Sequence, residues 1–329
     1  MLKIVLDAMG GDNAPLETVK GAVEALDIVE STIVLVGLED VIEEELKKYT
    51  YDSKRIEIVN ATEFITNEEK PIKAIRSKKD SSMVVAFNML KEGTVDAFIS
   101  AGSTGAIVTG GTLKVGRIKG IDRPALTIPF PTGNGVTVLT DAGANTECKP
   151  KNLMDFAIMG SIYAENVFDK VNPTVGLVNV GSEAGKGNSL VNGSYDLISA
   201  SSLNFKGNVE ARDIPLGTTD VVVCDGFTGN VILKLTEGVA KAFNNELKEV
   251  FGANLLTKLA AVPLLKGLKS FKKKMDYTEY GGAPLLGTKK PIIKAHGSSN
   301  SKAIRNAIRY AEKFAKNDVI HKIEEKIKE

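Results

Sequence analysis

Short apolar runs rich in valine and isoleucine alternate with longer amphipathic stretches along most of the chain. This alternation is typical of a doubly wound α/β fold, because each parallel strand is followed by a crossover helix. The apolar runs predict strands at Lys3–Leu6, Thr32–Val36, Ile56–Val59, Ala97–Ser100, Ala125–Pro129, Val136–Asp141, Thr174–Val178, Val221–Cys224 and Ile292–Ala295, with a weaker strand at Phe205–Asp213. Helical spacing predicts helices at Pro15–Glu30, Glu39–Lys48, Ser82–Lys91, Thr104–Val115, Lys151–Phe168, Asn188–Ala200, Asn230–Phe251 and Ser301–Lys316. We therefore expect residues 1–329 to form a single α/β domain with a mostly parallel sheet.

Nearly the same turn follows three of these apolar runs, and each turn precedes a helical pattern. The turns are Gly102-Ser103-Thr104-Gly105, Gly226-Phe227-Thr228-Gly229 and Gly297-Ser298-Ser299-Asn300. A turn of this kind leaves backbone N–H groups unpaired at a helix N-terminus, where they and the helix dipole attract an anion. Ligands of open α/β sheets bind beyond the carboxyl ends of the strands. We therefore expect the three turns to converge on one edge of the sheet and to form a phosphate-binding cleft.

Composition narrows the function further. The formal net charge is +1, so there is no overall attraction to nucleic acid. The two cysteines, Cys148 and Cys224, are far apart, and only two histidines are present, so neither a disulfide framework nor a zinc site is indicated. Neither nucleotide-binding glycine fingerprint occurs. We expect no metal or cofactor, and we interpret phosphate as a reactant.

The N-terminal pattern bears on location. A strand begins at Lys3, and Asp7 interrupts the apolar run too early for a signal peptide. Nowhere does an uncharged apolar run reach the roughly 18 residues that indicate a membrane span. These patterns predict a cytoplasmic protein.

A basic amphipathic arm is predicted at about residues 250–276, because no acidic residue lies between Glu249 and Asp276. Lysines alternate there with apolar residues at helical spacing, and Pro263 divides the segment. The pattern fits an interfacial anchor on an anionic membrane or a dock for an acidic protein. It also fits a buried helical hairpin with a solvated lysine face. The candidate contact residues are Leu255, Leu256, Lys258, Leu259, Val262, Leu264, Leu265, Lys266, Leu268, Lys269 and Phe271.

Four segments together resemble the bacterial phosphate acyltransferase of phospholipid synthesis. They are Asp7-Ala8-Met9-Gly10-Gly11-Asp12, Ser100 to Ala106, Asp141-Ala142-Gly143-Ala144-Asn145 and Asp225 to Asn230. The resemblance implies a fold similar to phosphotransacetylases and to the isocitrate/isopropylmalate dehydrogenase group. It also implies transfer of a fatty acyl group from acyl carrier protein to inorganic phosphate. The acyl phosphate would pass to a membrane glycerol 3-phosphate acyltransferase, and the enzyme would be a homodimer whose arm contacts the membrane.

In the implied reaction a phosphate oxygen attacks the thioester directly, with no covalent enzyme intermediate. Lys186, in a glycine-rich loop, is a candidate cation for phosphate or the oxyanion, or else a solvated loop lysine. Asn230 is a candidate oxyanion donor or a helix cap. His296 is a candidate for polarising phosphate or protonating the leaving thiolate, or else a structural histidine.

The remaining candidates divide by charge. The phosphate-binding candidates, for which helix capping is the alternative at the hydroxyl residues, are Gly10, Gly11, Gly102, Ser103, Thr104, Gly105, Thr228, Gly229 and Ser298. Carboxylates repel phosphate, so the acidic and amide residues at the strand ends are expected to orient loops and donors. These orienting candidates are Asp7, Asp12, Asp141, Asn145 and Asp225.

Three other functions stay open on the residues alone. A phosphotransacetylase that uses a short acyl-CoA would share the cleft but would not explain the basic arm. A metal- and NAD-dependent hydroxyacid dehydrogenase would need an aspartate cluster around a divalent cation. A non-enzymatic membrane-surface scaffold would have little need for three phosphate turns.

Overall fold

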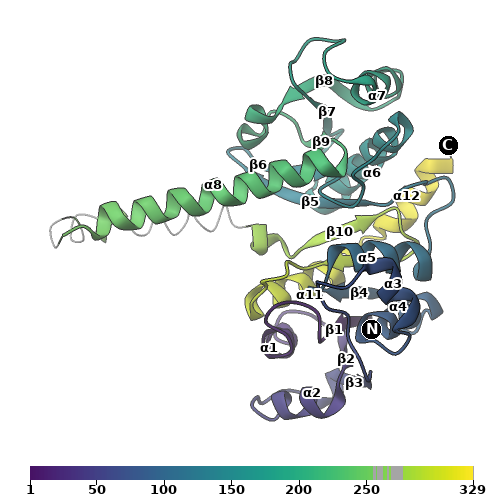
Figure 1. Ribbon diagram of the computed structural model, residues 1–329, viewed down its shortest axis with the longest axis vertical. Coiled ribbons are helices and arrows are strands. Elements are labelled where there is room, and N and C mark those ends of the chain that lie inside the picture. Colours follow the sequence, from purple (N-terminus) through teal and green to yellow (C-terminus); the bar gives the residue numbers. More distant parts are fainter. Residues whose placement is uncertain (255–256, 258–261, 265–266, 268–276, 329) are drawn as a thin grey trace.

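The computed structural model describes residues 1–254, 257, 262–264, 267 and 277–328. These residues form an α/β fold around one sheet of eleven strands, in the order β3-β2-β1-β4-β11-β10-β5-β6-β9-β7-β8 (Figure 1). The strands are β1 (Lys3–Asp7), β2 (Thr32–Gly37), β3 (Ile56–Asn60), β4 (Ala97–Ser100), β5 (Ala125–Thr132), β6 (Gly135–Thr140), β7 (Thr174–Asn179), β8 (Asn204–Glu210), β9 (Val221–Val223), β10 (Ala283–Leu286) and β11 (Ile292–Lys294). The predicted fold class is confirmed, and every predicted strand is present with small shifts at its ends.

The helices lie on both faces of this sheet. They are α1 (Leu16–Ala25), α2 (Glu39–Leu46), α3 (Pro71–Ser77), α4 (Ser82–Glu92), α5 (Thr104–Gly110), α6 (Pro150–Phe168), α7 (Ser189–Ser199), α8 (Gly226–Gly252), α11 (Ser301–Lys316) and α12 (Val319–Lys328). Helix α5 continues as a π-helical segment, Gly111–Val115. One face carries α1, α2, α6, α7, α11 and α12, and the other carries α3, α4, α5 and the start of α8. None of the described helices combines the length and the apolar content that crossing a bilayer requires.

The expected convergence of the three turns on one sheet edge is wrong. Strand β10 is antiparallel to both β11 and β5, and β5 is antiparallel to β6. These three antiparallel pairs reverse the strand direction in the second half of the sheet. Strands β6, β9, β7 and β8 therefore run opposite to β1, β4 and β11. The carboxyl ends of the two sets of strands therefore lie at opposite edges.

Sequence patterns missed β10, α3 and α12. Strand β10 is four residues long, contains Pro284 and lies between glycines, which resembles a turn. Helix α3 spans only one or two turns, and α12 lies in a lysine-rich tail. The weak prediction at Phe205–Asp213 corresponds to β8, where the pairing register with β7 shifts and Gly207 has φ of +89°. A glycine is required there because that φ strains other residues.

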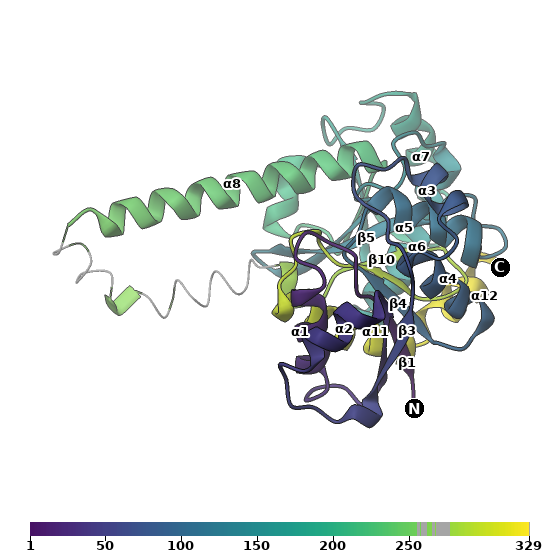
Figure 2. The same ribbon diagram turned by 60° about the horizontal axis from the view of Figure 1, so that its bottom comes forward.

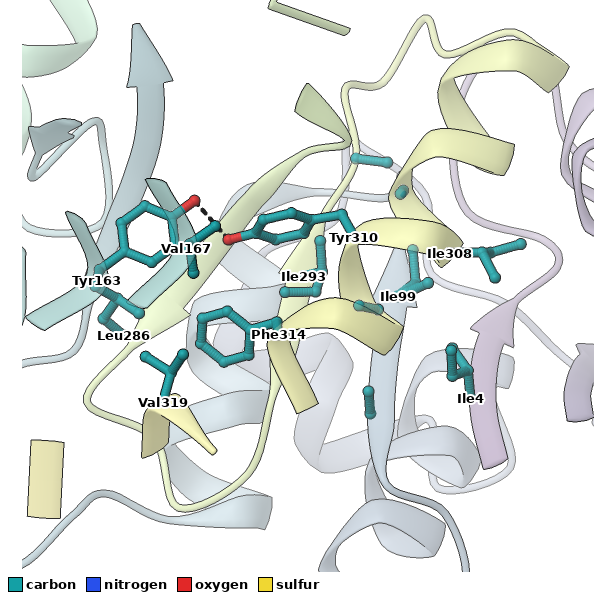
Figure 3. Packing of buried hydrophobic residues seen from close by; sticks show 14 of the residues in the cluster. Ile4, Ile99, Tyr163, Val167, Leu286, Ile293, Ile308, Tyr310, Phe314 and Val319 are labelled. Atoms are coloured by element: carbon teal, nitrogen blue, oxygen red, sulfur yellow. Dashed lines mark hydrogen bonds between the residues drawn. The ribbon is translucent and has the colours of Figure 1, made fainter. Parts of the chain in front are cut away.

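The largest core cluster joins the two halves of the sheet (Figure 3). Ile4 and Ile99 come from the first half, and Tyr163 of α6 lies under the second half. The Tyr310 hydroxyl of α11 donates a hydrogen bond of 2.5 Å to the Tyr163 hydroxyl, so two buried polar groups satisfy each other. This packing fixes the halves against each other, which sets the distance between their strand ends.

Candidate active site

A first group of loops is organised by Asp7, at the carboxyl end of β1. Its buried carboxylate accepts hydrogen bonds from Ser82 Oγ at 2.6 Å and from Ser100 Oγ at 2.7 Å. Ser100 Oγ in turn accepts the N–H of Gly102 at 3.0 Å. Burial raises the pKa of Asp7, whereas these hydrogen bonds act in the opposite direction. Asp7 therefore links the loop after β1 to the turn after β4.

Glycines allow these loops to approach closely. A Cβ on Gly10 would lie 2.6 Å from Asp7 Oδ2, and Gly11 has φ of +108° with its backbone against Ala101. The N–H of Asp12 donates to the carbonyl of Gly297 at 2.8 Å. The loops after β1, β4 and β11 therefore meet, and they bring together Gly10, Gly11, Gly102 and Gly297 with the two predicted orienting residues Asp7 and Asp12.

A second group of loops is organised by Asp141, after β6. Its fully buried carboxylate accepts the N–H groups of Leu126 at 2.9 Å, Ala144 at 3.0 Å and Asn145 at 2.7 Å. Burial raises the pKa of Asp141 to about 6, and the donors oppose that shift. The carbonyl of Asn145 then accepts the N–H of Gly226 at 2.7 Å. This chain of contacts fixes the first residue of α8.

The N-terminus of α8 is capped within the protein. Asp225 accepts hydrogen bonds from the Thr228 N–H at 2.9 Å and from the Thr228 hydroxyl at 2.8 Å. Thr228 therefore takes part in capping the helix, which was the alternative to phosphate binding for this residue. A Cβ on Gly229 would lie 1.9 Å from the carbonyl oxygen of Asp141, so only glycine fits. Asn230 is exposed and lies against Gly143. A Cβ added at Gly143 would be 3.5 Å from the Cβ of Asn230.

Helix α8 connects the two groups. It begins in the second group, and its Glu237 Oε1 lies 3.9 Å from His296 Nε2 in the first group. Lys234 forms a 2.9 Å ion pair with the other oxygen of Glu237. At 1.5 Å per residue, Asn230 and Glu237 are about 10 Å apart along the helix. The two groups therefore border one region of the molecule although their strands end at opposite edges.

His296, at the end of β11, is oriented by the third turn. Its Nδ1 accepts the N–H of Ser298 at 3.2 Å and lies 2.9 Å from the Ser298 hydroxyl. Burial lowers the pKa of His296, so the ring is neutral near pH 7. Because Nδ1 accepts a backbone N–H, we assign the ring proton to Nε2, on the side of Glu237.

Lys294 adds a half-buried cation beside this histidine. Burial, and after it the Lys234 ammonium, lower the pKa of Lys294 to about 8. Its Nζ donates to the Ala295 carbonyl at 3.0 Å. A cation held in poorly solvated surroundings is a strong partner for an anion, because the anion replaces the hydration that the cation has lost.

Two further polar atoms here lack partners among the described residues. Ser299 Oγ, at the start of α11, and Glu237 Oε1 are both buried without a hydrogen bond in that part of the chain. Buried polar atoms are nearly always paired, so the Ser299 hydroxyl is a candidate donor to a bound anion. The turn pattern in the sequence pointed to Ser298 instead of Ser299, and no sequence pattern pointed to Lys234, Glu237 or Lys294. A lysine inside the apolar run Ile292–Ala295 was the one signal available for Lys294.

Other predicted residues are less closely gathered. Lys186 lies in an exposed loop after β7. The Asn179 side-chain amide donates a hydrogen bond of 2.9 Å to the backbone carbonyl of Lys186. Within the described residues, the Lys186 ammonium has no partner. The Ser103 side chain makes no capping bond at the start of α5, which leaves Thr104 and Gly105 in an uncapped turn.

The predicted arm contacts lie almost entirely outside the described residues. Of that set, Val262 and Leu264 belong to a short 3₁₀ segment, and Leu264 is exposed. Within the described part of the chain, no group of three or more histidine, cysteine, aspartate or glutamate residues has an arrangement that could hold a metal ion.

A family model described as "Fatty acid synthesis protein" matches residues 2–322. The protein named "Phosphate acyltransferase" of Alkaliphilus oremlandii is 59% identical over 324 residues, covering 98% of this chain and 97% of that relative. The one of Clostridioides difficile is 52% identical over 323 residues, covering 98% and 95%. The chain belongs to the phosphate acyltransferase family. The resemblance seen in the four sequence segments is thereby confirmed.

Solved structures support the fold of this phosphate acyltransferase family member. A phosphotransacetylase from Streptococcus pyogenes superposes with a TM-score of 0.63 at 15% identity, covering 95% of this chain and 94% of the other. At that identity the similarity concerns the fold alone. It confirms the predicted similarity of fold to phosphotransacetylases.

Replacing Lys294 by methionine tests whether its ammonium binds phosphate. Loss of a charge-assisted hydrogen bond of about 1.5–3 kcal/mol should weaken phosphate binding roughly 10- to 100-fold at pH 7. In the native protein the affinity should fall as the pH rises through about 8, where Lys294 loses its proton, and this step should be absent from the variant. Calorimetric titration with inorganic phosphate measures both. Equal affinities and identical pH profiles for native protein, Lys294→Met and the exposed control Lys290→Met would contradict the assignment.

Proposed function

We propose that this acyltransferase moves a fatty acyl group from acyl carrier protein to inorganic phosphate, giving an acyl phosphate for phospholipid synthesis. The observation that carries the proposal is 59% identity, over nearly the whole chain, to a protein named phosphate acyltransferase. The geometry supports it, because α8 begins in the second loop group and reaches the first, where Lys234 and His296 lie on either side of Glu237. The cytoplasmic face of a membrane is the proposed place of action.

In the proposed reaction the first group holds phosphate. The backbone N–H of Gly11, the Ser299 hydroxyl, which has no hydrogen bond within the described residues, and the Lys294 ammonium supply the positive potential. Asp7 and Asp12 take no direct part and keep these loops in place. Positioning and charge stabilisation are sufficient, because phosphate is itself a competent nucleophile.

The acyl transfer itself proceeds in two steps. A phosphate oxygen adds to the thioester carbonyl carbon, and the carbonyl becomes a tetrahedral oxyanion, for which Asn230 and Lys186 are the proposed donors. The carbon–sulfur bond then breaks, and the thiolate takes the proton that hydrogenphosphate brought into the reaction. The neutral His296 is the proposed donor of a hydrogen bond from Nε2 to the departing sulfur. The products are an acyl phosphate and the free thiol of the carrier.

The cysteines support direct attack over an acyl-enzyme. Burial raises the pKa of Cys148 to about 12 and that of Cys224 well above its usual value. The nearby carboxylates of Asp141 and Asp225 act in the same direction. Thiols that stay protonated are poor nucleophiles, so neither side chain is suited to carry the acyl group.

Thiol release from palmitoyl-acyl carrier protein tests the proposed function. The native protein should release free thiol only when inorganic phosphate is present. Lys186→Ala should lower kcat at least tenfold, since an oxyanion donor acts mainly in the transition state. The matched control Lys206→Ala removes another exposed lysine and should leave the rate unchanged. Phosphate-dependent release only from a short acyl-CoA would favour the phosphotransacetylase alternative, and no release from any donor would contradict both.

We also propose that the chain forms a homodimer. The support is the exposed face of α8, which projects from the body of the molecule (Figures 1 and 2). Along it, large apolar residues recur at every fourth position, and each is half or more exposed, so that they form a stripe that winds slowly around the helix. They are Phe227, Val231, Leu235, Val239 and Phe243. A continuous exposed apolar stripe on a long helix marks a protein interface, and we propose that a second copy of the chain covers it.

Charging this stripe should separate the protomers. Leu235→Glu with Val239→Glu places two carboxylates in the proposed interface, where their desolvation is unfavourable. Light scattering after size exclusion should give twice the mass of one chain for native protein and the mass of one chain for the variant. The control Lys241→Gln with Asn245→Glu makes the same charge change on a neighbouring polar face. An unchanged mass in the stripe variant, or a monomeric native protein, would contradict the proposal.

Two parts of the proposal rest on the sequence alone. We propose that the basic arm at residues 250–276 contacts an anionic membrane surface, and that the product is handed there to a membrane glycerol 3-phosphate acyltransferase. The support is the absence of acidic residues between Glu249 and Asp276.

A further inference from the structure

Helix α3 carries an open pocket with unbalanced positive charge. The pocket has a volume of about 600 Å³ and is lined by Lys70, Pro71, Ile72, Lys73, Arg76 and Ser77. The three cationic side chains are exposed, and within the described part of the chain no carboxylate pairs with any of them. The neighbouring Lys78, by contrast, forms a 2.8 Å ion pair with Glu69. The pocket lining therefore contains three unpaired cations and no acid.

The pocket adjoins the first loop group. A Cβ on Gly105 would lie 2.7 Å from Pro71 Cγ, so the start of α3 packs directly against the turn that follows β4. Helices α3 and α5 lie side by side in both ribbon views (Figures 1 and 2). The segment before α3 also reaches this group, because the Asn67 amide donates to Asp12 Oδ1 at 3.4 Å. A molecule seated on α3 is therefore next to the proposed phosphate site.

The same surface has an apolar centre. Ile72 lies between the cationic positions and is 57% exposed, and Phe64 in the preceding segment is 39% exposed. Apolar contacts surrounded by charged groups are the usual composition of a transient protein interface. A free phosphate ion would use the cations but would gain nothing from Ile72.

We propose that the α3 surface, formed by residues 70–77, is the docking site for the acyl carrier protein. This inference rests on the proposed function, which requires a protein-bound thioester. The carrier is a small acidic helical protein, and its acyl group is attached to a phosphopantetheine arm that begins at a phosphodiester. Both the acidic surface and the phosphodiester are complementary to Lys70, Lys73 and Arg76. With the carrier on α3, the arm enters past Gly105 toward the phosphate site.

Complementary charge of this kind mainly raises the rate at which the carrier and the enzyme associate. Oppositely charged surfaces speed association, and the effect falls with ionic strength because salt screens exposed charges. The docking surface therefore contributes to the KM for the carrier-bound substrate and not to the chemical step. For a substrate without the carrier protein, changes in the charge of α3 should leave kcat/KM unchanged.

The test reverses charge on α3 and compares two donors. The variant is Lys73→Glu with Arg76→Glu, and the matched control is Lys47→Glu with Lys54→Glu, two exposed lysines outside the α3 surface. With palmitoyl-acyl carrier protein, the α3 variant should raise KM at least tenfold, leave kcat unchanged and flatten the dependence on salt. With palmitoyl-pantetheine, which is neutral and lacks the carrier, kcat/KM should match the native value. The Kd of the holo-carrier should rise by the same factor as KM.

Each other outcome is decisive. An equal KM increase in the α3 variant and the control would show a general charge effect and overturn the docking site. An unchanged KM in both would place the carrier elsewhere, for instance on the arm. A loss of activity with palmitoyl-pantetheine as well would assign α3 to the phosphate site and overturn docking. Failure of the native protein with both donors would overturn the proposed function itself, and the docking site with it.

Discussion

The buried carboxylate of Asp141 is the interaction on which the site depends. It accepts main-chain N–H groups on both sides of β6, from Leu126 and from the loop 142–145, and Asn145 then holds the first residue of α8. Each hydrogen bond to a charged acceptor contributes about 1.5–3 kcal/mol. The helix that begins there carries Lys234 and Glu237 to His296, in the other half of the sheet. Fixing one end of α8 therefore brings together loops that the strand directions keep apart.

Strand reversal explains why such a bridge is needed. In a fully parallel sheet, Asp7 and Asp141 would lie at the same edge and their loops would meet directly. The two reversals at β10 cancel, and the antiparallel pairing of β5 with β6 places Asp7 and Asp141 at opposite edges. Ala144 packs against apolar clusters of both halves, so the loop after β6 is in contact with each. The candidate site is consequently assembled from both halves, with α8 as the shared element.

Sequence reasoning predicted the local parts of this arrangement well. Valine and isoleucine runs located the strands, and the glycine turns located the loops around Gly10, Gly102 and Gly226, since these features depend on neighbouring residues. Strand β10 was missed, but the reversals at its two edges cancel, and the antiparallel pairing of β5 with β6 sets the direction of the second half. The residue pattern of each strand located it but did not show the direction in which it pairs. The Glu237–His296 contact joins residues 59 positions apart, and no pattern within α8 distinguishes Glu237 from a solvated helix residue. Ser299 was passed over because its burial, unlike its place in a turn, is a tertiary property.

The central claim is that phosphate itself attacks the thioester and that the enzyme never carries the acyl group. The most direct test mixes unlabelled palmitoyl-acyl carrier protein with isotope-labelled carrier that has a free thiol, and measures how much label appears in the palmitoylated carrier. An acyl-enzyme would catalyse this exchange without phosphate, since the second thiol could take the acyl group from the protein. Direct attack predicts no exchange until inorganic phosphate is added, and then exchange through reversible formation of acyl phosphate. Exchange at the same rate in phosphate-free solution would contradict the account.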